Sequence, residues 1–177
     1  MVKVPADKVV VVLHKGEVRE VHIGFSVFVN PLTETVKYIP VDVRTVDLKI
    51  TNVESSVKDE RANYYIEAVA QVKVTTDKEI LTRNAHRLIG MTNEQINSAA
   101  LKVLEDVLRR YAKHKTMMEV SENREDTARW VMGWANDELN PQAFEVRSFV
   151  IKDVMDMSSY LDVHNPDYLD QWFSSTD

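Results

Sequence analysis

Hydrophobic and polar side chains alternate along the chain with two different periods, one typical of strands and one typical of helices. In roughly the first 75 residues, apolar side chains mostly recur at every second position, as in strands with one buried face. The uninterrupted apolar run at 9–13 instead predicts a strand that is buried on both faces. A change of phase near Thr45 suggests a β-bulge. The pattern predicts strands at 9–13, 21–29, 41–50 and 66–74.

After Thr76 the apolar positions recur at helical spacing, and Thr92 to Gln95 matches a capping box at the start of the strongest helix. Helices are predicted at 76–90, 92–111 and 122–139, and a final strand at 144–154. Strands followed by helices favour the α+β class: a mostly antiparallel N-terminal β-sheet, then helices and a final strand. The expected organisation is a β-rich subdomain at 1–75, a helical α/β subdomain at 76–155 and an acidic, aromatic tail at 156–177.

Charge is distributed unevenly between the body and the tail of the chain. The 177 residues include 22 lysines and arginines and 28 aspartates and glutamates, which gives a net charge of −6. Six aspartates follow Lys152, but no lysine, arginine or glutamate does, so the residues after Lys152 carry the net charge of the chain. This acidic balance argues against a nucleic-acid partner.

The residue patterns that identify common catalytic and cofactor sites are absent from the sequence. Cysteine is missing, the four glycines are not spaced as in a nucleotide-binding loop, and the histidines lack the spacing of a helical metal site. We therefore predict no catalytic residue, no cofactor and no metal ligand. Two carboxylates brought together by the fold would still permit acid–base chemistry, so an enzyme with a pocket between sheet and helices is an alternative. No apolar run approaches the ~18 residues of a membrane-spanning helix.

Two groups of aromatic residues are candidates for binding. Trp130 and Trp134 are one helical turn apart, so they either widen a core-facing side or contact a neighbouring subunit. Arg124, nearby, is either a solvated charge or a brace for a carboxylate across a subunit boundary. In the tail, four apolar side chains share one side of a short predicted helix: Tyr168, Leu169, Trp172 and Phe173. They suit a cap folded onto the domain, a partner-docking segment or a frayed terminus.

The end of the predicted body carries the most specific pattern in the chain. Phe149 to Val154, followed by Asp156 and by Tyr160–Leu161, fills the pattern I-K-D-V-x-D-x-x-x-Y-L. This stretch closely resembles the end of the flotillin (reggie) domain in the stomatin/prohibitin/flotillin family, also called SPFH or band 7. Three earlier segments also resemble that domain: 70–81 its strand and first helix, 101–109 its long helix and 116–124 its next turn. The likeness covers about 66–161.

This resemblance implies a function. It implies a non-catalytic scaffold that self-assembles laterally at the cytosolic face of a membrane and organises microdomains, as a homo-oligomer or with related scaffold proteins. The family's domain continues into a coiled coil, so we expect the chain to be a fragment of a longer protein. The resemblance places four residues in the strand region where relatives meet the lipid surface, although a sheet core suits them too: Phe25, Val27, Phe28 and Val29. The alternative is a monomeric protein- or peptide-binding module without ring assembly.

Overall fold

The computed structural model describes residues 1–57 and 63–164, which form two antiparallel sheets and five helices. The first sheet has the order β2-β1-β3 and contains β1 (Lys8–His14), β2 (Glu17–Ile23) and β3 (Glu34–Pro40). The second has the order β4-β5-β6 and contains β4 (Arg44–Glu54), β5 (Asn63–Val74) and β6 (Phe144–Asp156). The helices are α1 (Lys78–Ile89), α2 (Asn93–Ala112), α3 (Met117–Glu122), α4 (Arg124–Leu139) and α5 (Met157–His164).

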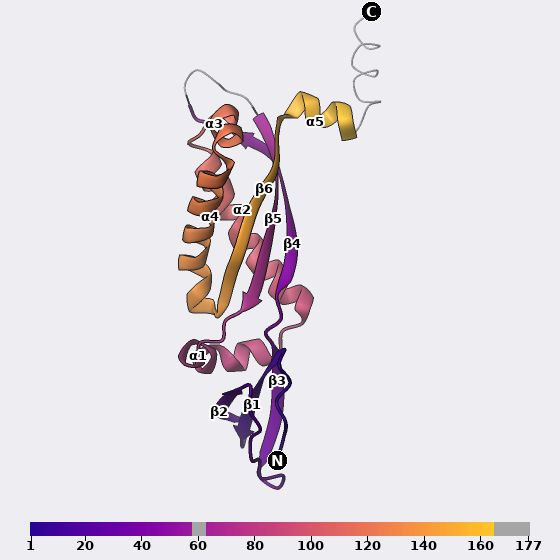
Figure 1. Cartoon of the computed structure of the whole chain (residues 1–177), viewed down its shortest axis with the longest axis vertical. Coiled ribbons are helices and arrows are strands. Elements are labelled where there is room, and N and C mark those ends of the chain that lie inside the picture. The colour runs from indigo at the N-terminus through magenta and orange to yellow at the C-terminus, as the bar shows by residue number, and fades with distance from the viewer. Residues whose placement is uncertain (58–62, 165–177) are drawn as a thin grey trace, which may run out of the picture.

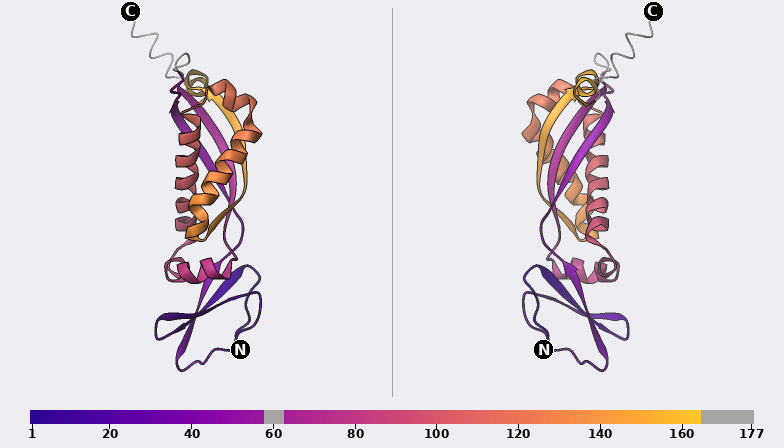
Figure 2. Two further views of the ribbon diagram at one scale, coloured as in Figure 1. Left: turned by 90° about the vertical axis from the view of Figure 1, so that its left-hand side faces the viewer. Right: turned by 90° about the vertical axis from the view of Figure 1, so that its right-hand side faces the viewer.

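The elements are stacked along the long axis of the molecule (Figure 1). Helices α2 and α4 lie side by side on one face of the β4-β5-β6 sheet (Figure 2). In the part of the chain described, the opposite face meets only α5, which contacts β5 and β6 at one end of the sheet. Helix α1 separates this layered body from the small β2-β1-β3 sheet, which lies at one end of the molecule. Helices α3 and α5 lie at the other end, so the small sheet and α5 are far apart.

The main core lies between the β4-β5-β6 sheet and its two covering helices. Inward positions of β5 alternate as predicted from Ile66 to Val74, and they pack against the apolar stripe of α2. The predicted capping box is present, because the Thr92 hydroxyl accepts from the Gln95 N–H and the Gln95 side chain accepts from the Thr92 N–H. The antiparallel sheet, the helices and the final strand together confirm the predicted α+β class.

Several predicted strand boundaries are wrong. The strand expected at 21–29 ends at Ile23, because Gly24 has a φ of +79° and turns the chain. The expected bulge at Thr45 is not there: the register shift lies between Ile50 and Val53, and Asn52 between them has a φ of 53°. Strand β3 was not predicted, since Ile39 is its only buried side chain and its alternation is therefore weak.

The strands divide between two sheets rather than forming a single one. The predicted boundary between 75 and 76 stays a prediction, although β6 returns across it to pair with β5. The tail residues proposed for partner docking, Tyr168, Leu169, Trp172 and Phe173, lie outside the described residues.

Candidate functional site

An uncharged loop covers the outer face of the small sheet. Residues 24–33 contain no charged side chain. Val27 is buried and pairs with Val2 through two backbone hydrogen bonds of 2.8 and 2.9 Å. Because successive side chains of β1 point to opposite faces, Val10 and Val12 leave the main core and form a second apolar cluster with Val27. The loop is therefore fastened to the sheet by its middle.

Three large apolar side chains of this loop point into solvent. Phe25, Phe28 and Leu32 are 81%, 78% and 92% exposed, and we call them the apolar tip. Their exposure rules out the core interpretation of Phe25 and Phe28, whereas Val27 does belong to a core and Val29 packs against it. The tip lies on the small sheet, at the end of the molecule opposite α5 (Figure 1).

The tryptophans of α4 lie on the surface. Trp130 and Trp134 are 53% and 40% exposed, and their rings meet edge to face with centroids 5.2 Å apart. They do not widen the core-facing side of α4, whose buried positions are Thr127, Val131, Ala135 and Leu139. Together the pair lines a groove of about 270 Å³ between α2 and α4 with Tyr111, His114 and Lys115. We call these five residues the tryptophan groove.

The tryptophan groove lies beside a basic run. Five of the seven side chains in 109–115 are arginine, lysine or histidine, at the C-terminal end of α2 where positive charge favours the helix dipole. Of these five, His114 and Lys115 line the groove, whereas the others line a separate pocket with Asp106 and Glu138. Arg110 pairs with Glu138, while Lys115 lies 3.7 Å from Glu119 and its ammonium 6.0 Å from the Tyr111 ring centroid. The sequence carried this signal as a short basic run, but only the fold puts it beside exposed aromatic rings.

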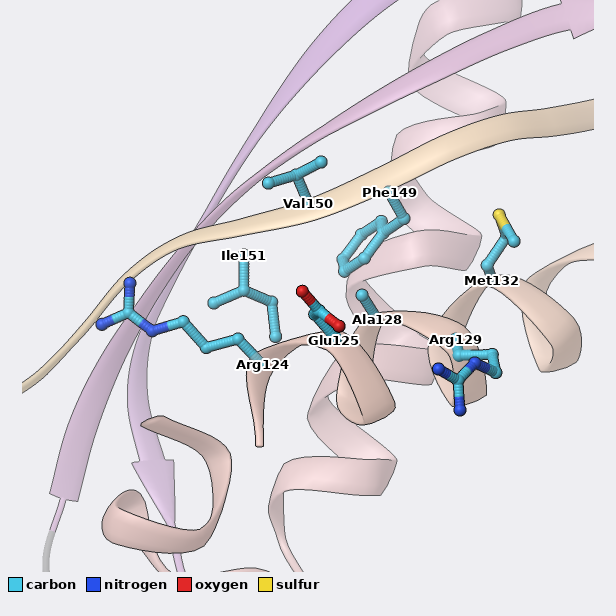
Figure 3. Close-up of a pocket in the computed structure, with 8 residues that line it drawn as sticks. All are labelled: Arg124, Glu125, Ala128, Arg129, Met132, Phe149, Val150 and Ile151. Carbon is cyan, nitrogen blue, oxygen red and sulfur yellow. The ribbon is translucent and has the colours of Figure 1, made fainter. Parts of the chain in front are cut away.

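A second pocket lies between α4 and the edge strand β6 (Figure 3). It has a volume of about 420 Å³, and we call it the edge pocket. Phe149 and Ile151 extend from β6 toward α4, whereas Val150 extends the other way. The remaining lining residues belong to α4: Arg124, Glu125, Ala128, Arg129 and Met132.

Arg124 fastens the first turn of α4 to β6. Its Nη1 donates to the Lys152 carbonyl at 2.7 Å, and its Nη2 lies 3.9 Å from the Asp153 carboxylate. The sequence singled out this arginine for a carboxylate across a subunit boundary. Within the chain it already holds the strand that carries the family-like pattern.

Asn136 occupies the free edge of β6 further along α4, and sequence reasoning missed it. Its side-chain carbonyl accepts from the Val146 N–H at 2.8 Å, and its amide donates to the Val146 carbonyl at 3.2 Å. Asn136 thus makes the two hydrogen bonds that a neighbouring strand would make. It satisfies backbone groups that have no partner in an exposed edge strand. No sequence signal distinguishes it from other helical asparagines.

The start of α5 is fixed to the sheet by a capped turn and a ring stack. Asp156 accepts from the Ser159 N–H at 2.8 Å and from the Ser158 and Ser159 hydroxyls. These hydrogen bonds lower the pKa of Asp156 to about 2. Tyr160 stacks on Tyr65 with ring centroids 4.4 Å apart, and burial raises the pKa of Tyr65 to about 12.

The groups with shifted pKa values do not gather at either pocket. Burial raises the pKa of Tyr64, whose hydroxyl donates to the Ala112 carbonyl at 2.8 Å. Hydrogen bonds lower the pKa of three separate glutamates: Glu20, Glu34 and Glu119. Across residues 1–57 and 63–164, no group of side chains is arranged to hold a metal ion, and no helix is long and apolar enough to cross a membrane.

Comparison with known proteins gives a consistent result. Residues 2–163 match the model of the SPFH domain / Band 7 family. The chain is 32% identical to Flotillin-2a of Danio rerio over 130 residues, which is 73% of this chain and 30% of that protein. It is 29% identical to human Flotillin-2 over 68% of this chain and 29% of that protein, and 27% identical to human Flotillin-1 over 78% and 32%. The chain thus spans about a third of the length of these relatives.

Proposed function

The chain belongs to the SPFH domain / Band 7 family and is flotillin-like, and on that premise we propose that it is a membrane-associated scaffold domain without catalytic activity. In this proposal it lies peripherally at the cytosolic face of a membrane and self-assembles laterally to organise microdomains. Its partners are further copies of the chain or related scaffold proteins. The relatives carry flotillin names, which supports a microdomain role.

The apolar tip is the observation that carries the membrane part of the proposal. Large exposed apolar side chains on one loop are candidates for a binding site, and the loop holding Phe25, Phe28 and Leu32 has no charge that would oppose insertion. Aromatic side chains suit the membrane interface because their rings are apolar and flat. The tip therefore supplies a contact with lipid that does not need a spanning helix.

The edge pocket and the tryptophan groove are the surfaces that we assign to subunit contact. Both lie on α4, and they carry Arg124, Trp130 and Trp134. Exposed tryptophans are enriched among the residues that dominate interface energies. A neighbour that meets this flank with a different surface forms a heterologous contact, which closes into a ring when the rotation permits. The tip is at the far end from α3 (Figure 1), so a row of copies can present all tips to one membrane.

Sedimentation velocity of the full chain over a concentration series, with and without lipid vesicles, tests this proposal. We expect the sedimentation coefficient to rise with concentration and the chain to pellet with vesicles. A chain that stays monomeric and ignores vesicles would contradict both parts. If that monomer bound peptides in the tryptophan groove, the monomeric binding module would become the better functional assignment than the scaffold.

Replacing both Trp130 and Trp134 by alanine is expected to weaken self-association roughly tenfold or more, because two exposed rings at an interface are lost. The rings lie outside the core, so the far-ultraviolet circular dichroism spectrum should stay unchanged. Sedimentation equilibrium measures the association constant. Val43→Ala removes an exposed apolar side chain between β3 and β4 and is the matched control. Unchanged self-association in the double variant would remove the tryptophans from the subunit contact.

A further inference from the structure

Another pocket lies on the small sheet, directly beside the apolar tip. It has a volume of about 350 Å³ and lies between the turn that joins β1 to β2 and the segment that leads into β3. Apolar side chains from both segments contribute to its lining: Leu13, Pro31 and Leu32. Because Leu32 also belongs to the apolar tip, the pocket and the proposed membrane contact are continuous. We call it the tip pocket.

The loop that forms one wall of the tip pocket is held in place by its own hydrogen bonds. The Asn30 carbonyl accepts from the Thr33 N–H at 3.2 Å and from the Glu34 N–H at 2.9 Å. The Asn30 side-chain carbonyl accepts from the Leu32 N–H at 3.1 Å. A ligand that enters the pocket therefore meets a wall that is already ordered, which lowers the entropic cost of binding.

The facing wall is a tight turn that carries a positive charge. Lys15 and Gly16 have φ values of 52° and 88°, as in the two-residue turns that join twisted strands. The Lys15 side chain lines the pocket and is exposed. It makes no hydrogen bond or ion pair with another residue in the part of the chain that the structure describes. The turn thus presents an ammonium group that is available to a ligand.

The acidic groups near this ammonium are engaged elsewhere. Glu34 lines the pocket, but its carboxylate accepts from the Asn30 N–H at 2.8 Å and pairs with Arg19 on β2, so its side chain is only 7% exposed. Glu17, which follows the turn, lies 3.6 Å from His86 on α1. The lining therefore keeps one positive charge that no carboxylate compensates.

The chemistry of the tip pocket matches a phosphate group that is attached to an apolar chain. Lysine binds phosphate as a point charge, and the hydroxyls of Thr33 and Thr35 in the lining are further donors. A free phosphate ion would gain nothing from the three apolar side chains, whereas a phospholipid also covers them with its acyl region. We propose that the tip pocket binds the phosphate of an anionic phospholipid, with Lys15 as the positive group.

This inference rests on the proposed function, because a lipid headgroup reaches the pocket only when the tip contacts a membrane. It adds a preference for a class of lipid. The tip alone requires only an apolar layer, and the pocket favours lipids that carry a net negative charge beside their phosphate-bearing glycerol. Attraction between one lysine and an anionic leaflet is worth about 1 kcal/mol, which is roughly a fivefold change in affinity.

Binding of the full chain to two kinds of vesicle tests the proposal. One is phosphatidylcholine alone, and the other contains phosphatidylcholine and phosphatidylglycerol. We expect Lys15→Gln to lower the affinity for the anionic vesicles roughly fivefold or more, measured by co-sedimentation. Its affinity for phosphatidylcholine vesicles should stay unchanged, because the tip is intact. An unchanged affinity for the anionic vesicles would overturn the proposal.

A matched variant separates the pocket from surface charge in general. Lys37→Gln removes the same charge from an exposed position of β3 that does not line the pocket, and should bind both kinds of vesicle like the unchanged chain. Equal losses in the two variants would reduce the effect to surface charge and overturn the pocket as a site. Thermal unfolding followed by circular dichroism should give both variants the midpoint of the unchanged chain.

Two further results separate the possible ligands and the two proposals. Inorganic phosphate should not displace the chain from anionic vesicles beyond the effect of sodium chloride at equal ionic strength. Specific displacement would assign the pocket to free phosphate and overturn the lipid assignment. Binding to phosphatidylcholine vesicles without any effect of Lys15→Gln on the anionic ones would end this inference but leave the membrane proposal standing. Absence of binding to either vesicle would contradict the proposed function itself, and this inference with it.

Discussion

Replacing both Phe25 and Phe28 by serine is expected to lower the affinity of the chain for lipid vesicles by roughly 100-fold or more. Full burial of a phenylalanine side chain is worth about 1.5–3 kcal/mol, and every 1.4 kcal/mol is a factor of ten in affinity. Both rings are free to enter a membrane because the loop is held by Val27 and not by them. Vesicle co-sedimentation over a range of lipid concentrations measures the change.

The same substitutions should leave the fold intact, since 81% and 78% of the two side chains are already exposed. Thermal unfolding followed by circular dichroism is therefore expected to keep its midpoint. Met118→Ser removes an exposed apolar side chain from α3, at the opposite end of the molecule, and should bind vesicles like the unchanged chain. Equal binding by the double serine variant and the Met118 control would show that the tip is not the membrane contact.

Replacing Asn136 by leucine is expected to lower the free energy of unfolding by about 3 kcal/mol. Leucine has a similar size but cannot hydrogen-bond, so the N–H and the carbonyl of Val146 both lose their partner. Each unsatisfied group in a partly buried position costs about 1–3 kcal/mol. Denaturant unfolding followed by tryptophan fluorescence measures the difference, and it is large against the 5–15 kcal/mol by which domains are usually stable.

Two further variants separate the hydrogen bonds from other effects of changing α4. Asn136→Asp keeps an acceptor for the Val146 N–H but faces the Val146 carbonyl with a carboxylate, so we expect a loss of stability similar in sign to that of leucine. Asp137→Ala changes the neighbouring, exposed position and should alter stability by less than about 0.5 kcal/mol. If Asn136→Leu were as stable as this control, the contact with Val146 would contribute nothing to the edge of β6.

The strength of the local pattern decided which elements could be predicted. Helix α2 combines a capping box with a continuous apolar stripe, and both follow from residues close in sequence. Strand β5 shows clear alternation because helices cover one of its faces, and β1 is uniformly apolar because it is buried on both. Strand β3 has little pattern since only one of its seven side chains is buried, so its backbone pairing with β1 determines its conformation.

The candidate sites were harder to predict from the sequence than the helices and strands, because they depend on tertiary contacts. The sequence identified Phe25, Phe28, Trp130 and Trp134 as unusual, yet large apolar residues have the same pattern whether they face a core or solvent. The turn at Gly24 and the bridge between Val27 and Val2 decide the outcome for the loop. For α4, the outcome depends on which stripe packs on the sheet, and that stripe contains small residues such as Ala135 rather than the rings.

The amino-acid sequence by itself determined the α+β class, the main helices, the neutral body with its acidic tail, and the likeness to flotillins, because each of these depends on composition or on residues near one another in the chain. Only the tertiary structure decided the division into two sheets, the exposure of the tip, the junction of basic and aromatic residues in the groove, and the pairing of Asn136 with Val146. These features depend on contacts between segments that are distant in sequence. Local periodicity does not predict which surfaces remain exposed once β5 and β6 have packed.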